Sequence, residues 1–478
     1  MSSTTLSVVV VGGGFGGLTA AIECKLRGMN VTIIEKYPTS ADQGDVIDFF
    51  PNGGRIIAKW ADGRVGRDML KCCINQGNKF EFYNQKGEFL CEEPWNLYPH
   101  HYPHQFAGHR GEMHELCMNY AKEIGVEVLL GQSVVDYLGS DDDNVPVGVV
   151  LASGEKLLAD VVVAADGPRS MARQKVLKLP DTKVNSGYAI FRAFFTMTEE
   201  HKKNPLLKSF SDPNEDMTKL WAGPDVHCLL YSWNKGNDVG WVVTHKDDQD
   251  IGESWSFPGT IEDTLKYLDE GSFEERFKEV VRQTPPGRIV DYKLVWRDPL
   301  QTWLSQSGRT VVIGDAAHTH LPSSGQGGAQ ALEDGVTLAV CLDRAKGDVK
   351  LALKVFERIR FNRSHIIHMS GVSNRDGYHQ VEWTREFVEA NPGSMTVHRL
   401  DWVIEHDAEK NAEEHFEHLA ADVKSGKQGT LEELSLPAGG HIPAVALDAV
   451  KSQQSEEIHI DGHKINETVR KIVSSVAA

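Results

Sequence analysis

The first residues with a chemical signature are three glycines spaced as Gly12-x-Gly14-x-x-Gly17, directly after the apolar run Leu6–Val11. A turn of this kind presents the backbone amides of a helix N-terminus to a pyrophosphate. Gly12 permits the tight turn, Gly14 lets the phosphate approach the backbone, and Gly17 lets the helix pack closely on the strand. Glu35 ends the next apolar run about 20 residues later, where a carboxylate can hold ribose hydroxyls. We therefore predict a site for an adenine dinucleotide.

Two later clusters contain other side chains that could bind such a cofactor. The first, Val163–Arg173, reads V-A-A-D-G-P-R-S-M-A-R, and the second, Gly314–Gly328, reads G-D-A-A-H-T-H-L-P-S-S-G-Q-G-G. Within the second cluster, Asp315 can accept hydrogen bonds from cofactor hydroxyl groups. The glycine loop that follows leads into a helix predicted to begin near Ala329, whose positive end is directed at whatever lies against the loop.

The elements that must position these residues follow from the hydrophobic pattern. An apolar run at 6–11, a helical stretch at 15–27, a stop at Gly28 and a second apolar run at 31–34 predict a βαβ unit. Fully apolar strands are typical of parallel sheets covered on both faces. Because the runs at 161–165 and 310–313 have the same character, we predict that distant parts of the chain assemble one sheet.

The pattern changes between residues 180 and 299. Aromatic, alternating strands are predicted at 188–196, 226–233 and 239–245, which is typical of an antiparallel sheet. From residue 327 to about residue 370 the pattern is helical, and a polar appendage rich in His and Glu follows. We therefore predict a second, mostly antiparallel unit inserted into the first.

The three motifs, in this order, resemble the fingerprints of the flavoprotein aromatic hydroxylases, the single-component FAD monooxygenases. The two later clusters match the family segments D-G-x-x-S-x-x-R and G-D-A-A-H…P…G-Q-G, and the segment Trp402–Glu409 resembles tails of the fungal salicylate-hydroxylase-like branch. The resemblance implies FAD as the cofactor and NADH or NADPH as a transient co-substrate. It also implies that O2 forms a flavin C4a-hydroperoxide, which hydroxylates a small aromatic substrate, with or without oxidative decarboxylation.

The resemblance also implies which residues meet the cofactor. Arg110 matches the family arginine that contacts FAD, Pro322 lines the face where oxygen adds, and the segment 44–52 is the loop in which the backbone meets the flavin. The implied FAD-binding residues are Gly12, Gly14, Gly17, Glu35, Val46, Arg110, Asp166, Asp315, Pro322, Gly327 and Gly328.

The implied fold is α/β, with a Rossmann-like FAD-binding domain of the aromatic-hydroxylase type, an inserted and mostly antiparallel β-sheet substrate domain, and a C-terminal helical appendage. The expected boundaries are 1–75, 105–180 and 300–370 for the discontinuous FAD-binding domain, 76–104 and 181–299 for the substrate-binding domain, and 371–478 for the C-terminal helical extension.

Two residues of the inserted unit are candidates for catalysis. Arg192 falls where several fungal members place a pocket arginine, and its cation could hold a phenolate or carboxylate. Tyr231 alternates to a face from which it could donate a hydrogen bond. Asp48 is a weaker candidate, as a base near the flavin loop. An alternative remains open, in which Arg192 and Tyr231 are ordinary sheet residues with satisfied partners.

Composition narrows the partners and the location. A net charge of −18 opposes binding to nucleic acid or to an anionic membrane surface. No apolar stretch reaches the roughly 18 residues of a membrane span, so we expect no stable membrane association. Seven scattered cysteines, without C-x-x-C spacing, indicate a reducing, cytoplasmic location and no disulfide framework. We expect a monomer or homodimer.

Several histidines raise the question of a metal site. They are His100, His101, His104 and His109 in an irregular stretch, and His365 and His368 on one helix face. Because no carboxylate or thiol accompanies them at a fixed spacing, we predict solvated histidines and no metal.

Two other functions remain open. The same machinery can epoxidise an alkene of an indole or polyketide natural product, and an FAD-binding reductase or redox-responsive binding protein would not use oxygen productively at all. A single Gly-x-Gly-x-x-Gly argues against Baeyer–Villiger monooxygenases and disulfide reductases, which carry a second copy, and the W-x-W-x-I-P signature of flavin halogenases is missing.

Overall fold

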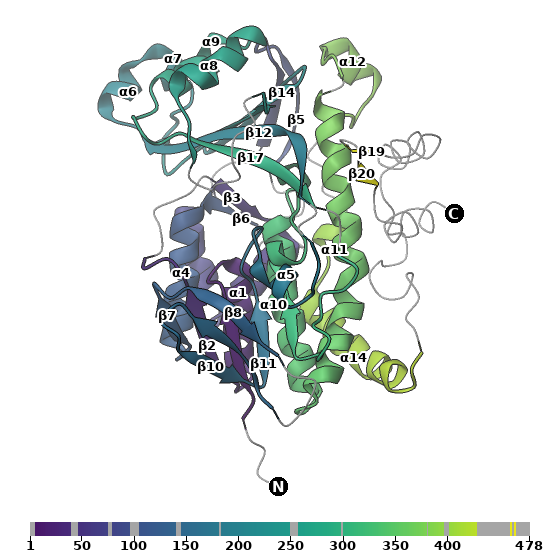
Figure 1. Cartoon of the computed structure of the whole chain (residues 1–478). Coiled ribbons are helices and arrows are strands. Elements are labelled where there is room, and N and C mark those ends of the chain that lie inside the picture. Colours follow the sequence, from purple (N-terminus) through teal and green to yellow (C-terminus); the bar gives the residue numbers. More distant parts are fainter. Residues whose placement is uncertain are drawn as a thin grey trace.

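The computed structural model describes residues 5–39, 46–74, 79–95, 105–139, 145–180, 183–248, 257–297, 300–379, 381–395, 401–427, 459–460 and 463–464. Two layered regions lie one above the other, and one long helix, α11 (Val349–His379), runs beside both (Figure 1). The predicted βαβ opening is confirmed: a helix at Phe15–Leu26 is followed by a strand at Asn30–Glu35. His100, His101 and His104 lie outside the described residues.

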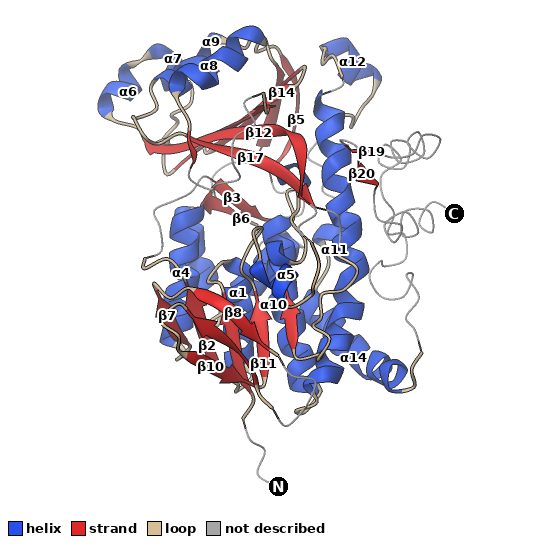
Figure 2. Ribbon diagram, in the orientation of Figure 1, coloured by secondary structure: helices blue, strands red, loops and turns tan. Residues whose placement is uncertain are grey.

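The first region is built on a parallel sheet assembled from distant parts of the chain, as predicted. Its order is β18 (Thr310–Val312), β11 (Val161–Ala164), β1 (Ser7–Val11), β2 (Asn30–Glu35) and β7 (Glu127–Leu130). One face is covered by helices that include α1 (Phe15–Leu26), α4 (Arg110–Glu123) and α10 (Gly327–Arg344) (Figure 2). The other face is covered by a small antiparallel sheet of β8 (Val134–Leu138), β9 (Val147–Leu151) and β10 (Lys156–Ala159).

Burial on both faces explains why β1 is apolar throughout. Val8 and Val10 pack in the core that contains the helices, whereas Val9 and Val11 pack with Val149 of the small sheet. A strand whose alternate side chains both face apolar layers cannot alternate with polar residues. The run of valines therefore reflects a three-layer arrangement.

The second region is an eight-stranded sheet, antiparallel except where β13 and β4 run parallel. Its order is β16 (Phe257–Pro258), β17 (Val290–Arg297), β12 (Lys183–Thr196), β15 (Asp238–Lys246), β14 (Val226–Trp233), β13 (Met217–Gly223), β4 (Lys79–Asn84) and β5 (Phe89–Pro94). The outer face is covered by α6 (Glu199–Lys203), α7 (Pro205–Lys208), α8 (Ile261–Glu270) and α9 (Glu275–Arg282) (Figure 2). The three predicted strands of this unit are confirmed.

A two-stranded ribbon lies between the two regions (Figure 1). It pairs β3 (Val46–Phe49) with β6 (Phe106–His109), and α2 (Pro51–Lys59) follows it directly. The loop that we expected over 44–52 is thus, in its described part, a strand and the start of a helix. The apolar residues of β3 find a pairing partner in β6, and Pro51 stands at a first helical position, where its missing N–H leaves no bond unmade.

Short elements complete the first region. They are α3 (Arg64–Met69), α5 (Met171–Lys175) and the 3-10 turns η1 (Leu70–Cys72), η2 (Gly314–Ala316) and η3 (Pro322–Ser324). The C-terminal part contains α12 (Arg385–Ala390), α13 (Asp401–Ile404), α14 (Ala408–Lys424), β19 (His459–Ile460) and β20 (His463–Lys464). Through Ala412, Phe416 and Leu419, α14 joins the helical core of the first region.

Helix α11 continues past residue 370, where the helical pattern was expected to end. Gly371 lies inside this helix and packs against η3. A Cβ there would be 3.2 Å from the Cβ of Ser324. Close packing therefore accounts for a glycine inside a long helix. No helix within the described ranges is long and apolar enough to cross a membrane, and all seven cysteines are free thiols.

Candidate functional site

The three sequence motifs meet at the carboxyl ends of the neighbouring strands β1, β11 and β18. Gly12 has a φ of +105°, and a Cβ on it would lie 2.2 Å from the carbonyl oxygen of Ala165. The amide of Ile313 in turn donates to the carbonyl of Ala164 at 3.0 Å. Parallel strands thus bring residues 12, 166 and 315 to one edge, which is where open α/β sheets bind ligands.

The glycines of the first motif have different roles. A Cβ on Gly17 would lie 2.0 Å from the carbonyl oxygen of Gly12, so only glycine lets α1 pack on its strand. Gly14, by contrast, has an ordinary φ of −69°, and a Cβ on it would have no atom within 4 Å. It is the N-cap of α1 and provides no side-chain cap. The open space above Gly14 and the amides of the first turn are therefore available to an anion.

Glu35 is oriented by the turn that it faces. Its Oε2 accepts a hydrogen bond from the Gly13 amide at 2.7 Å, and its Oε1 accepts one from the Tyr37 amide at 2.9 Å. On the other side of the turn, His114 Nε2 lies 2.6 Å from the Gly13 carbonyl oxygen, and burial lowers the pKa of His114. A neutral imidazole donating to that carbonyl holds the glycine turn in place. Sequence reasoning missed His114, whose only signal is its spacing of four residues from Arg110 on one helix.

One carboxylate oxygen of Asp166 accepts hydrogen bonds from the protein, and the other has no hydrogen-bond partner among the described residues. Its Oδ2 accepts hydrogen bonds from the amides of Met171 and Ala172, at 2.9 and 3.2 Å, and from the Tyr137 hydroxyl at 3.1 Å. It therefore satisfies the N-terminal amides of α5. Its Oδ1 is buried and has no hydrogen-bond partner among the described residues, so a hydroxyl group of a ligand could satisfy it.

Arg173 joins the two later motifs. Its Nε donates to the carbonyl oxygen of Ala316 at 2.7 Å, its Nη1 to that of Pro168 at 2.9 Å, and its Nη2 to the carbonyl oxygen of Asp315 and to Thr319 Oγ1. A buried guanidinium needs several acceptors, and here backbone carbonyls from both motifs supply them. The sequence contained this residue in the first cluster, but nothing in its spacing indicated the second.

Asp315 and Arg110 are far apart in the sequence, but their charges interact in the folded chain. Burial raises the pKa of the Asp315 carboxyl, and the positive charges of Arg110 and Arg173 oppose that rise. Arg110 is the first residue of α4. The fold therefore places these two residues of the sequence prediction within electrostatic range of each other.

Two segments, which we call the glycine loops, approach each other: residues 50–53, which lead into the first turn of α2, and residues 325–328, which lead into the first turn of α10. A Cβ on Gly328 would lie 2.7 Å from Phe49 Cε1, and one on Gly53 would lie 2.9 Å from Ala329 Cα. Helix α10 begins at Gly327, two residues before the expected start, and its N-cap Gln326 makes no side-chain cap. Pro322, on the adjoining turn η3, is exposed. Since Gly16 packs on Ala331 with a would-be Cβ contact of 3.2 Å, the uncapped N-termini of α1 and α10 belong to packed neighbours.

Arg192 and Tyr231 point to the same face of the eight-stranded sheet. Phe194 pairs with Gly240, Gly240 pairs with Tyr231, and Arg192 lies two residues before Phe194 on β12, so its side chain is on the same face. The residues on either side of Arg192, Phe191 and Ala193, pack against the outer helices, so the face with Arg192 is the opposite one. Arg192 is 8% exposed, and its guanidinium lies 5.6 Å from the ring centroid of Tyr292.

That face lies against the β3–β6 ribbon. Val46 Cγ2 would be 3.0 Å from a Cβ on Gly240, and the rings of His109 and Phe194 lie 4.3 Å apart. A glycine in β15 thus makes room for Val46. Asp48, on the same strand, accepts a hydrogen bond from Gln105 Nε2 at 2.9 Å. Val46, predicted to contact FAD, and Asp48 therefore lie where the two regions meet.

The prediction that His109, His365 and His368 are solvated is wrong. His365 and His368 are each 1% exposed, and His109 is buried as the N-cap of α4. The face of α11 that carries the first two packs against Trp303 and His320. Burial accordingly lowers the pKa of both, that of His368 to about 3. The described residues contain no group of His, Cys, Asp and Glu that could hold a metal ion.

The edge where the motifs meet fits an adenine dinucleotide. Open space lies over Gly14, the N-termini of α1 and α10 lack side-chain caps, and the buried Asp166 Oδ1 lacks a partner among the described residues. An extended, anionic molecule with several hydroxyl groups would satisfy all three features.

Comparisons with known proteins point the same way. Two profiles described as FAD binding domain match residues 74–347 and 7–42. Asperlicin C monooxygenase of Petromyces alliaceus is 32% identical over 425 residues, which cover 88% of this chain and 90% of the relative. The FAD-dependent monooxygenase okaB of Penicillium ochrochloron is 32% identical over 432 residues, which cover 89% and 94%. The crystal structure of CtdE in complex with FAD and substrate 4 is 28% identical, covers 88% of this chain and 100% of its own, and has a TM-score of 0.81.

Proposed function

Because this chain belongs to the family of FAD-dependent monooxygenases that contain the FAD binding domain, we propose that it uses NADH or NADPH and O2 to add one oxygen atom to a phenolic or other electron-rich aromatic compound. One observation carries this proposal: the cofactor edge of the parallel sheet faces, across the β3–β6 ribbon, a sheet face that combines aromatic side chains with the buried cation of Arg192. The name of the Petromyces alliaceus relative supports a natural product as substrate.

When bound, FAD would supply the redox chemistry, reduction by the nicotinamide co-substrate and activation of O2. The residues at the sheet edge would hold it: the amides after Gly14 would bind the pyrophosphate, Glu35 ribose hydroxyls, and Asp315 hydroxyl groups between them. The N-terminus of α10 would stabilise negative charge on the reduced flavin. Arg110 would contribute a positive charge within electrostatic range of Asp315.

We also propose that the eight-stranded sheet, with residues 76–104 and 181–299, is the substrate-binding domain. The apolar side chains around Tyr231 exclude water, which would otherwise divert activated oxygen to hydrogen peroxide. Arg192 holds an anionic oxygen of the substrate and thereby keeps the ring electron-rich. Tyr231 donates a hydrogen bond to the substrate and thereby orients it.

Asp315→Ala is expected to weaken FAD retention by about tenfold or more, because hydrogen bonds to a charged group contribute about 1.5–3 kcal/mol. The measurement is the ratio of bound flavin to protein after gel filtration, followed by titration of the apoprotein with FAD. Asp315→Asn keeps the size of the side chain and should lose less. A flavin occupancy equal to that of the wild type in the alanine variant would remove Asp315 from the site.

Arg192→Ala is expected to leave FAD bound and to shift most of the NAD(P)H consumption to hydrogen peroxide, because the substrate would no longer be held in place. Peroxide and product are quantified in the same reaction. Arg192→Lys should recover part of the coupling, since it retains the positive charge. Product formation at the wild-type yield in the alanine variant would place Arg192 outside the substrate pocket.

The function itself is tested with an aerobic panel of phenolic acids and indoles, scored for NAD(P)H oxidation, peroxide and product, with labelled dioxygen. At least one compound is expected to accelerate NAD(P)H oxidation and to gain one labelled oxygen atom. A ring hydroxyl in the product supports hydroxylation, whereas an epoxide, or a diol or rearranged product derived from it, would indicate epoxidation. NAD(P)H oxidation that none of the compounds alters, without an oxygenated product, would support the non-oxygenating reductase instead.

A further inference from the structure

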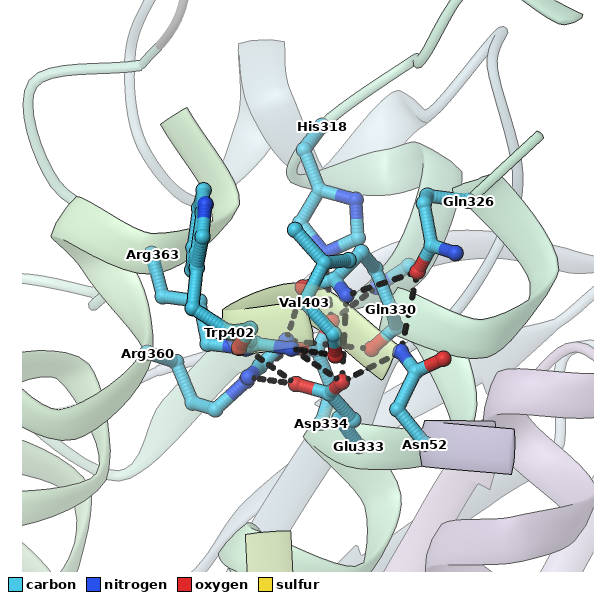
Figure 3. Close-up of polar contacts among 11 residues, drawn as sticks. Asn52, His318, Gln326, Gln330, Glu333, Asp334, Arg360, Arg363, Trp402 and Val403 are labelled. Carbon is cyan, nitrogen blue, oxygen red and sulfur yellow. Dashed lines mark hydrogen bonds and ion pairs between the residues drawn. The ribbon is translucent and has the colours of Figure 1, made fainter. Parts of the chain in front are cut away.

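A buried network of charges lies directly behind the two glycine loops (Figure 3). Its centre is Glu333 on α10, and its two cations are Arg360 and Arg363 on α11, all three with no exposed surface. Arg363 contacts Glu333 through two atoms, Nε to Oε2 at 2.8 Å and Nη2 to Oε1 at 2.9 Å. Arg360 pairs with Glu333 and, through Nε at 2.8 Å, with Asp334. Two carboxylates therefore balance two guanidinium groups.

This balance keeps Glu333 ionised. Burial alone would raise the pKa of its carboxyl, but Arg363 and Arg360 hold that pKa well below the ordinary value. Buried ion pairs of this kind are weak sources of stability, because apolar residues of the same volume are often as favourable or better. A charge network that a protein keeps in its interior is therefore better explained by the arrangement that it imposes on its neighbours.

On one side, the network reaches both glycine loops. Asn52 Nδ2 donates to Glu333 Oε1 at 2.7 Å and to Gln326 Oε1 at 2.9 Å (Figure 3). Asn52 lies in the first turn of α2, directly after β3, and Gln326 is the N-cap of α10 between Gly325 and Gly327. One carboxylate thus sets the position of Asn52, and Asn52 sets the position of the Gln326 side chain.

On the other side, the network is completed by the C-terminal part of the chain. Arg363 Nη1 donates to the carbonyl oxygen of Trp402 at 3.0 Å, and Nη2 to that of Val403 at 2.7 Å. The guanidinium also lies 5.5 Å from the centroid of the Trp402 ring. Because α13 supplies these acceptors, Arg363 can satisfy its donors only when the C-terminal part is in place.

We propose that Glu333 is a positioning residue for the flavin ring, acting through Asn52 and Gln326, and that α13 completes this device by holding Arg363. The proposal rests on the placement of FAD under the proposed function. Glu333 itself is buried within α10 and would act on the cofactor only through Asn52 and Gln326. Its effect is to hold the spacing between the start of α2 and the start of α10.

The test compares purified holoenzymes of Glu333→Gln and Asn52→Ala with Glu23→Gln as the matched control. Glu23 is also a buried carboxylate of the first region, paired with Arg27 and with Trp60 Nε1, and among the described residues its hydrogen bonds and ion pairs reach neither glycine loop. At full FAD occupancy, the first two variants should shift the flavin absorption bands and midpoint potential and increase the FAD dissociation constant at least fivefold. Glu23→Gln should lower the unfolding temperature without these changes.

These readouts need no aromatic substrate, so they remain valid if the proposed function fails. If Glu333→Gln does not fold, Asn52→Ala decides the question, because it breaks the link to the loops and leaves the ion pairs intact. Arg363→Lys, which keeps the charge but cannot reach Glu333 and both carbonyls, should give an intermediate shift. A flavin spectrum, potential and affinity in Asn52→Ala equal to those of the wild type would overturn the proposal.

Discussion

Gly14→Ala is expected to produce a folded apoprotein that binds FAD about 10- to 100-fold more weakly. The backbone of Gly14 has an ordinary φ, and a Cβ there meets no atom within 4 Å, so folding should be unaffected. The added methyl group instead occupies the open space at the N-cap of α1, where a phosphate must approach. Losing one hydrogen bond to a charged group costs about 1.5–3 kcal/mol, and each 1.4 kcal/mol is about tenfold in affinity.

Two other glycines separate binding from folding. Gly139→Ala adds a methyl group at another glycine with a negative φ and no atom within 4 Å, so both stability and FAD binding should match the wild type. Gly17→Ala must push apart backbone atoms, since its Cβ would be 2.0 Å from the Gly12 carbonyl oxygen, and it should lower the unfolding temperature even without FAD. The measurements are thermal unfolding of the apoproteins and fluorescence titration with FAD. Unchanged affinity in Gly14→Ala would show that the cofactor does not approach this turn.

Mild acid is expected to destabilise the protein strongly, and three buried histidines alone account for about 4 kcal/mol of the loss between pH 7.5 and pH 5.5. Burial, the largest cause in each case, lowers the pKa of His227, His365 and His368. The folded protein therefore keeps these rings neutral, whereas the unfolded chain binds a proton at each below about pH 6.5. Stability is fully present above that value and is lost as the pH falls towards the folded pKa, which is about 3 for His368. Each group contributes about 1.4 kcal/mol at pH 5.5.

The comparison uses urea unfolding at pH 7.5, 6.5 and 5.5, with His365→Leu as the informative variant. Neither ring nitrogen of His365 has a hydrogen-bond partner among the described residues, and its neighbours are Phe361 and Trp303. Leucine should therefore be tolerated at pH 7.5 and should reduce the loss at pH 5.5 by about 1.4 kcal/mol. If the free energy of unfolding of the wild type does not change across this pH range, the conclusion that the folded protein keeps these histidines neutral is wrong.

The turn and the sheet that carry the first motif could be predicted because their requirements are local. Gly12, Gly14 and Gly17 report steric requirements within one turn, and an apolar strand before them indicates the covered parallel sheet. The same reasoning placed Glu35 and the start of α10 within two residues of their positions. What failed was equally informative: the resemblance implied a loop at 46–49, but the segment is a strand, since it pairs with β6, which lies far along the chain.

The histidines and the charged helix faces show the limit more clearly. His365 was expected to be solvated, and Arg360 and Arg363 are charged residues of the same helix, yet all three are buried. Nothing in the local pattern distinguishes a charge that faces water from one that faces a partner on another helix. The partners of Arg363 come from residues 333, 402 and 403, and only packing brings them together.

The amino-acid order alone therefore determined the coenzyme class, the two-unit architecture and the strands that build each sheet, since these depend on short-range sterics and on hydrophobic periodicity. Tertiary packing alone decided which polar groups are desolvated, which helix supplies each counter-charge, and that α13 closes the network behind the glycine loops. The reason is physical: the energy of a buried charge depends on the atoms within a few ångströms of it, and those atoms belong to segments that the chain brings together only on folding.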